Sequence, residues 1–154
     1  MQRIEPTLGK TGGGFTTDCT KCMSCAIACS FFREGKVNPK LSRIRLRSHE
    51  LEWVKGKSDQ IIERKICKQC PGTPPCMLAC PVEAITRDPK TEAVVIDDEK
   101  CTRCKKCIEV CPFDAIWFNK EVNKILKCDL CGGDPQCVEW CPINALKYVK
   151  LKEG

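Results

Sequence analysis

The sixteen cysteines are the residues of this 154-residue chain whose type and spacing could do chemistry. They fall into four groups of four with none left over: Cys19, Cys22, Cys25, Cys29; Cys67, Cys70, Cys76, Cys80; Cys101, Cys104, Cys107, Cys111; Cys128, Cys131, Cys137, Cys141. The first and third groups are spaced C-x2-C-x2-C-x3-C, and the second and fourth are spaced C-x2-C-x5-C-x3-C. Such tetrads of thiolates are ligands for metals, above all for iron–sulfur clusters.

The spacing within each group favours a 4Fe-4S cluster. Three cysteines at i, i+3 and i+6 can bind three irons of one cubane, and the fourth cysteine of the bacterial run C-x2-C-x2-C-x3-C-P binds the other cluster of two-cluster ferredoxins. Cys80, Cys111 and Cys141 are followed by proline, whereas Cys29 is followed by Ser30. Proline shapes the backbone after the cysteine but does not itself bind iron. We therefore expect Cys29 to bind iron too, with an altered local geometry. The sequence therefore predicts four 4Fe-4S clusters.

Zinc and disulfides are the alternative uses of these cysteines. Zinc sites usually combine two C-x2-C pairs that lie about 12 to 20 residues apart, whereas each tetrad here fits within 11 or 14 residues. Residues 1–15 contain no apolar run of signal-peptide length, so we expect a cytoplasmic location, where thiols stay reduced. Both alternatives are therefore disfavoured.

The charge of the chain has to be counted together with the clusters. The formal net charge of +6 would by itself favour a nucleic-acid partner. An oxidised 4Fe-4S core with four thiolates carries about −2, so four clusters bring the protein to about −2 overall. We therefore expect no nucleic-acid partner. No run of about 18 apolar residues is present, so we also expect no direct membrane insertion.

No apparatus for substrate chemistry accompanies the cysteines. The segment 9–14 resembles a phosphate-binding loop, but Ile4 stands where the first glycine of that motif is needed. Catalytic signatures such as H-E-x-x-H or a dinucleotide-binding glycine pattern are missing from the sequence. We therefore predict a non-catalytic protein.

The segments between the tetrads predict short helices and β-hairpins. After the first two Cys-Pro steps we expect a short helix, the second of them over 112–116. Two hairpins are expected, one with strands over 84–87 and 93–97 around a turn at 88–91, and one with strands over 116–118 and 124–127. A last strand is expected over 145–151. Residues 31–66 are an insertion that we expect to form a hairpin on an outer edge. The two spacings alternate, short then long, twice. The predicted fold is therefore α+β, with two fused bacterial dicluster ferredoxin-like units around four clusters.

These tetrads, the Cys-Pro endings and the proline-bearing long spacings resemble the four-cluster ferredoxin-like electron-transfer subunits of molybdopterin-type oxidoreductases, over about residues 18–150. The segment 29–35, followed by Asn38-Pro39 and by residues 42–44, is similar to the small iron–sulfur subunit of tungsten aldehyde oxidoreductase-type complexes. The resemblance implies single-electron relay between a large tungsten or molybdenum pterin subunit and a flavin subunit, a ferredoxin or further copies of this chain. The alternatives are the iron–sulfur subunit of a molybdenum reductase or formate enzyme, and a free-standing polyferredoxin.

The resemblance also implies how the ligands are shared, because the family pairs the first motif with the fourth and the second with the third. The implied sets are Cys19, Cys22, Cys25 with Cys141; Cys128, Cys131, Cys137 with Cys29; Cys67, Cys70, Cys76 with Cys111; and Cys101, Cys104, Cys107 with Cys80. The alternative pairs neighbours, first with second and third with fourth.

The expected domain organisation follows from this pairing. Residues 1–17 form a flexible or docking arm, and residues 18–154 form the polyferredoxin domain. One lobe holds the motifs of 67–111, the other holds 19–29 with 128–141, and 31–66 is inserted.

Overall fold

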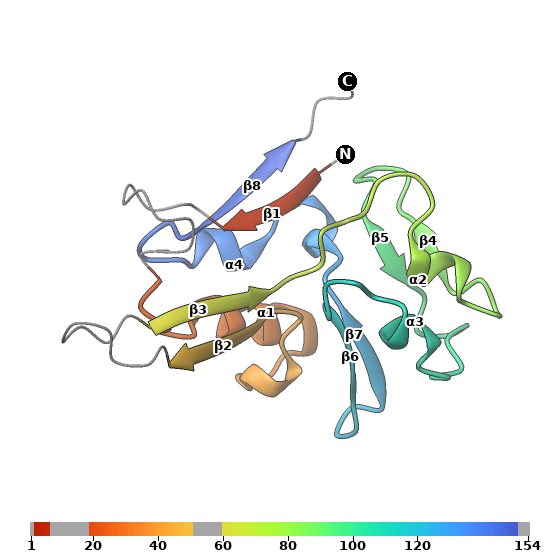
Figure 1. The fold of residues 1–154 in the computed structure, drawn as a ribbon, viewed down its shortest axis with the longest axis horizontal. Coiled ribbons are helices and arrows are strands. Elements are labelled where there is room, and N and C mark those ends of the chain that lie inside the picture. Colours follow the sequence, from red (N-terminus) through yellow and green to blue (C-terminus); the bar gives the residue numbers. More distant parts are fainter. Residues whose placement is uncertain (1, 7–18, 51–59, 151–154) are drawn as a thin grey trace.

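Short helices and two-stranded antiparallel sheets make up the protein in the computed structural model, which describes residues 2–6, 19–50 and 60–150 (Figure 1). The strands pair as β1 (Gln2–Pro6) with β8 (Leu146–Lys150), β2 (Arg45–Glu50) with β3 (Gln60–Lys65), β4 (Ile85–Arg87) with β5 (Val94–Ile96), and β6 (Ile116–Asn119) with β7 (Lys124–Lys127). The helices are α1 (Ser24–Glu34), α2 (Pro75–Leu78), α3 (Lys106–Glu109) and α4 (Gln136–Glu139), with 3-10 turns η1 (Pro39–Leu41) and η2 (Leu130–Gly133). The predicted α+β class is confirmed.

The two short hairpins between cluster motifs form where the sequence predicted them. In the β4–β5 turn, the side chain of Asp88 accepts hydrogen bonds from the backbone N–H groups of Lys90 and Thr91, at 2.9 and 2.7 Å. In the β6–β7 turn, the side chain of Asn119 accepts in the same way from the N–H of Glu121, at 2.8 Å. These side-chain bonds supply local partners for the turn backbone, which is why such short strands can reverse.

The insertion over 31–66 forms the predicted hairpin as β2 and β3. Its base is held in the core by Leu41, Ile44 and Ile66, whose side chains are buried. Residues 51–59 of this insertion lie outside the described part of the chain.

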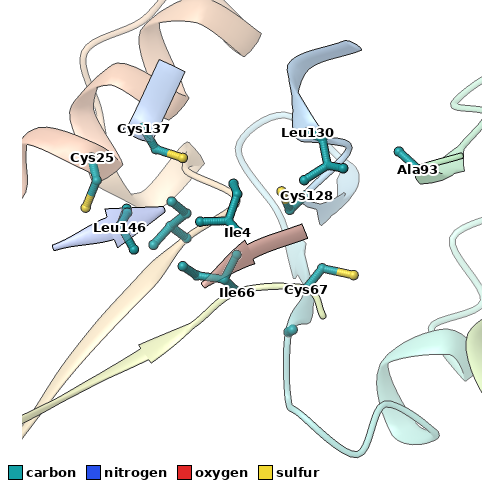
Figure 2. Packing of buried hydrophobic residues seen from close by; sticks show 11 residues of the cluster. Ile4, Cys25, Ile66, Cys67, Ala93, Cys128, Leu130, Cys137 and Leu146 are labelled. Carbon is teal, nitrogen blue, oxygen red and sulfur yellow. The ribbon is translucent and has the colours of Figure 1, made fainter. Parts of the chain in front are cut away.

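The first residues of the chain belong to the core. β1 pairs with β8 along its whole length, and Ile4, opposite Tyr148, is only 1% exposed. In Figure 2, Ile4 lies among Leu146, Ile66 and the cysteines of the core. The prediction of an arm over 1–17 is therefore wrong for residues 2–6, because the edge of β8 offers backbone partners that a short segment with one apolar residue can use. Residues 7–17 lie outside the described part of the chain.

The short helices lie before the Cys-Pro steps and not after them. Each of α2, α3 and α4 carries the third cysteine of its motif, and residues 81–83 and 112–114 form turns. The predicted helices at these two places are wrong because Glu83 and Asp114 adopt left-handed conformations, with φ of 50° and 44°. A residue in that conformation ends a right-handed helix.

Two clusters of buried apolar side chains form the core, and cysteines contribute to both. One gathers Ile4, Cys25, Ile44, Ile66, Cys67, Ala93, Ala115, Cys128, Leu130, Cys137 and Leu146, and the other gathers Cys76, Ile85, Val94, Cys107, Ile116 and Ile125. The sulfur ligands are thus packed as part of the core. None of the helices in the described ranges has the length and apolar character needed to cross a membrane.

Replacing Ile4 tests whether β1 is a core strand. We expect Ile4→Ala to lower the free energy of unfolding of the cluster-loaded protein by about 2 to 4 kcal/mol, because a buried aliphatic side chain is removed from a packed site. Urea unfolding followed by visible absorption measures the change. The matched control is Val37→Ala at a 68% exposed position, which should change stability by less than about 0.5 kcal/mol. Equal stability of the two variants would contradict the assignment.

Candidate iron–sulfur sites

The loops that carry the first two cysteines of each motif share one left-handed position. The residue two positions after the first cysteine has a positive φ in all four motifs: Lys21 57°, Gln69 49°, Arg103 59° and Leu130 58°. In both short motifs the residue after the second cysteine does the same, as Met23 and Lys105 show with φ of 65° and 66°. In the two short motifs, left-handed residues stand on both sides of the second cysteine, an arrangement that can turn N–H groups toward one concave side and so suits an anion or an iron–sulfur cluster. In the fourth motif, Leu130 and Cys131 are both left-handed.

The third cysteine of every motif lies on a helix and is buried. Cys25 lies on α1, Cys76 on α2, Cys107 on α3 and Cys137 on α4, with exposures between 3% and 9%. In the fourth motif, the widened loop is built by Gly132 and Gly133, with φ of 70° and 104°. In the second motif, the buried Pro74 leads directly into α2. The longer spacing therefore lengthens the loop and keeps the third cysteine on a buried helix.

Two cavities are each bordered by four cysteines. One is lined by Cys67, Cys70, Cys76 and Cys111, and the other by Cys19, Cys22, Cys25 and Cys141. Each cavity combines three cysteines of one motif with the last cysteine of a distant motif, and apolar residues such as Val94 and Leu146 complete the walls. Four cysteines around a cavity whose other lining residues are mostly apolar fit the ligand requirement of a 4Fe-4S cluster.

The cysteines of the fourth motif lie near Cys29. Burial raises the pKa of the Cys137 thiol, and the neighbouring charges of Cys128 and Cys29 raise it further. Burial also raises the pKa of Cys131, with a smaller contribution from Cys29. The structure thus brings the end of the first motif to the fourth motif.

The third motif gathers its own first three cysteines. Burial raises the pKa of Cys107 to about 11, with Cys101 as the largest neighbouring charge and Cys104 also contributing. Cys80 packs against the same apolar cluster as Cys101 and Cys107. The neighbour from the second motif that acts on the pKa of Cys107 is Cys76, so the closeness of Cys80 to this motif rests on the shared apolar cluster alone.

The last cysteine of three motifs accepts a hydrogen bond from a backbone N–H four residues later. The N–H groups of Ala84, Ala115 and Ala145 donate to the sulfurs of Cys80, Cys111 and Cys141, at 3.3, 3.4 and 3.1 Å. Each alanine is buried and follows a left-handed residue. The repeat Cys-Pro-x-x-Ala, present three times, was the sequence signal for these donors, and the sequence analysis missed it.

Cys29 obtains the same kind of donor by another route. With Ser30 in place of proline, α1 continues to Glu34, and the Ser30 hydroxyl donates to the carbonyl of Ile27 at 2.9 Å. The chain then returns so that the N–H of Arg43 donates to the Cys29 sulfur at 3.2 Å. The guanidinium of Arg43 forms a buried ion pair with Glu34 at 2.8 Å, which fixes the returning segment. The altered geometry expected at Cys29 is confirmed, but no sequence signal pointed to Arg43.

Burial makes several of the thiols hard to ionise. It raises the pKa of Cys25 to about 11, and it raises the pKa of Cys128 and Cys137 further still. Thiolates are the species that bind iron, so ligation has to release protons and compensate the burial of negative charge. In the described part of the chain, no three His, Cys, Asp or Glu side chains meet in a geometry suited to one metal ion. What supports a cluster is the set of four cysteines on the wall of each of the two cavities, because four thiolates are the ligands that a 4Fe-4S cluster needs.

Comparison with known proteins identifies the chemistry of these sites. The family model of the 4Fe-4S dicluster domain matches residues 59–151. The chain is 40% identical over 121 residues to the polyferredoxin-like subunit of aliphatic sulfonate oxidoreductase from Pyrococcus furiosus, covering 79% of this chain and 65% of that protein. Sixteen cysteines in four tetrads match four 4Fe-4S clusters.

Two further relatives are subunits of other oxidoreductases. The chain is 32% identical over 131 residues to subunit beta of NADH-dependent phenylglyoxylate dehydrogenase from Aromatoleum evansii, covering 85% of this chain and 28% of that protein. It is 29% identical over 143 residues to the thiosulfate reductase electron transfer subunit of Salmonella typhi, covering 88% and 73%. The chain spans less than two thirds of the length of each of the first two relatives.

Paired alanine substitutions test how the motifs share ligands. If Cys67 and Cys111 bind the same cluster, the double variant Cys67→Ala/Cys111→Ala should lose one cluster, and iron should fall from about 16 to about 12 per chain. The matched control Cys67→Ala/Cys80→Ala should damage two clusters and fall to about 8. Iron analysis and EPR of the reduced protein give the counts. Two damaged clusters in the first variant would support pairing of neighbouring motifs instead.

Proposed function

The chain belongs to the 4Fe-4S dicluster domain family, and from that premise we propose that it is the electron-transfer subunit of an oxidoreductase complex. The observation that carries this proposal is the arrangement of four cysteine tetrads in one small chain, with four cysteines around each of two cavities. A bound 4Fe-4S cluster accepts and releases one electron at a time. The proposed role is non-catalytic relay.

The residues of this chain hold and shield the clusters in this proposal. The buried third cysteines keep water from the cluster faces, and backbone N–H groups reach the sulfurs of Cys29, Cys80, Cys111 and Cys141. Hydrogen bonds to sulfur and exposure to solvent are two of the factors that set cluster potential. A rigid scaffold of this kind needs no substrate pocket of its own.

We propose the ligand sets that pair the first motif with the fourth and the second with the third. The two cysteine-lined cavities and the effect of Cys29 on the thiols of the fourth motif support this pairing. The division into a lobe of motifs 67–111 and a lobe of 19–29 with 128–141 follows from the same pairing.

The proposed partner is a large tungsten or molybdenum pterin subunit, with a flavin subunit, a ferredoxin or further copies of this chain at the other end. The likeness of residues 29–44 to the small subunit of tungsten aldehyde oxidoreductase-type complexes supports tungsten. The thiosulfate reductase relative supports the reductase alternative, and a match of 31% identity over 152 residues to the iron–sulfur subunit of formate dehydrogenase-O from Escherichia coli supports the formate alternative.

An exposed aromatic group beside two of the proposed sites supports contact with the catalytic subunit there. Phe31, Phe32 and Trp140 are 49%, 46% and 52% exposed. Their ring centroids lie 5.5 Å apart for Phe31 and Phe32, and 6.0 Å apart for Phe32 and Trp140. Trp140 directly precedes Cys141, and α1 carries both phenylalanines just after Cys29. Exposed aromatic side chains are enriched in protein interfaces.

Purification of the chain from its native cells under anaerobic conditions tests the partner. We expect a large subunit to co-purify, because the relay needs a donor, and we expect metal analysis to find tungsten in it. Molybdenum in place of tungsten would move the assignment to the reductase or formate class. Recovery of the cluster-loaded chain alone, at native concentrations, would contradict the complex and favour a free-standing polyferredoxin.

The aromatic group can be tested in the same purification. We expect Phe32→Ala/Trp140→Ala to reduce the recovered partner at least tenfold while iron stays at about 16 per chain, because interface aromatics often contribute 2 kcal/mol or more. The control is Leu78→Ala, a 74% exposed residue on α2, which should leave recovery unchanged. Full recovery with the double variant would place the contact elsewhere.

A further inference from the structure

Lys127 is a buried lysine with neutral partners. It is the last residue of β7, directly precedes Cys128, and is 4% exposed. Its ammonium group donates to the backbone carbonyl of Val94 and, at 3.1 Å, to that of Cys128. No ion pair found within the described ranges includes it. A buried ammonium is costly unless negative charge compensates it.

The negative charge that faces Lys127 is that of cysteine ligands. Lys127 lines the same cavity as Cys67, Cys70, Cys76 and Cys111. Burial raises the pKa of the Cys76 thiol, and Lys127 is the largest charge that opposes this rise. Lys127 opposes the rise at Cys128 as well, where burial is the main cause and Cys67 the largest neighbouring charge. The ammonium therefore lies between the second motif and the start of the fourth.

Gln69 fixes the two groups that Lys127 contacts. Its side-chain N–H donates to the carbonyl of Cys128 at 2.9 Å, and its side-chain oxygen accepts from the N–H of Val94 at 2.8 Å. Gln69 is fully buried. Because Gln69 and Lys127 hold the same two residues, the ammonium has a defined position inside the protein.

Lys124, at the other end of β7, has a different environment. Its side chain is 34% exposed, and its ammonium pairs with the carboxylates of Glu34 and Asp98, at 3.5 and 3.3 Å. Its charge is therefore both neutralised locally and screened by water. Of the two lysines, Lys127 is the one whose charge acts on the cysteine-lined cavity.

We infer that the Lys127 ammonium raises the reduction potential of the cluster bordered by Cys67, Cys70, Cys76 and Cys111. The inference rests on the proposed electron-transfer function. An oxidised cluster with four thiolates carries about −2, and reduction adds one electron and no proton, so the charge becomes about −3. A fixed positive charge stabilises the more negative state more strongly. This cluster therefore has a higher reduction potential than a cluster without a buried ammonium beside it, and it accepts electrons from such a cluster.

Potentiometric titration followed by EPR, on the full cluster-loaded chain, tests the inference. We expect Lys127→Met and Lys127→Gln each to retain about 16 irons and to lower the equilibrium constant for reducing one cluster at least tenfold, a shift of about 59 mV to more negative potential. Glutamine can still donate a hydrogen bond but carries no charge. An equal shift of the reduction potential in both variants would therefore show that the shift comes from the lost charge. Lys120→Met, which removes an exposed lysine, should leave every potential unchanged.

The outcomes separate this inference from the proposed function. Unchanged potentials in both Lys127 variants, with iron retained, would overturn the inference alone. Normal potentials in the Gln variant but not in the Met variant would assign the effect to hydrogen bonding and overturn it too. Loss of iron from both variants would make Lys127 a requirement for assembly and not a tuning residue. A wild-type chain without reducible clusters would refute the electron-transfer function itself.

Discussion

The closure of cysteine sets across long stretches of chain is the constraint on which the rest of the structure depends. Cys25 and Cys141 border one cavity although they are 116 positions apart in the sequence, and Cys67 and Cys111 border another. Closing such loops costs conformational entropy, and a chain with 6% aromatic residues has little apolar area to offset it. Cysteines belong to both apolar clusters of the core. Cluster binding and folding are therefore one coupled process.

One local plan, used four times, satisfies this constraint. After the last cysteine of a motif, the chain turns, donates an N–H to that sulfur and then begins a strand. Ala84, Ala115 and Ala145 immediately precede β4, β6 and β8. The first motif follows the same plan with a longer excursion, since Arg43 donates to Cys29 and β2 begins at Arg45. The hairpins thus position the ligands as well as connecting the motifs. In the first motif, the longer segment from Ser30 to Arg43 takes the place of the short turn that follows Cys-Pro in the other three motifs.

Sequence reasoning succeeded where the determinants are local. Cysteine spacing predicted the cluster chemistry, and the turn residues Asp88 and Asn119 lie in hairpins that the pattern predicted. It failed at β1, because pairing with β8 joins the two ends of the chain and five residues carry almost no pattern. It also failed at the Cys-Pro steps, where proline is compatible with a helix start but a left-handed residue two positions later ends it. Lys124 and Lys127 look alike in the sequence, and only the packing of β7 separates them.

The charges inside the protein make the cysteine sites unequal. Arg43 reaches the first motif, but Glu34 neutralises its guanidinium within the protein. The cavity of Cys19, Cys22, Cys25 and Cys141 also has a cation in its lining, Arg64, but this side chain is only partly buried and Cys22 is exposed, so water screens the charges there. At the cavity of the second motif, the cation is buried and its hydrogen-bond partners are carbonyls. Because screening is weak in a buried site, a single lysine there has more effect on cluster energetics than the larger number of basic residues on the surface. The net charge of the chain therefore says little about the relative potentials of its clusters, which depend on where a few cations are buried.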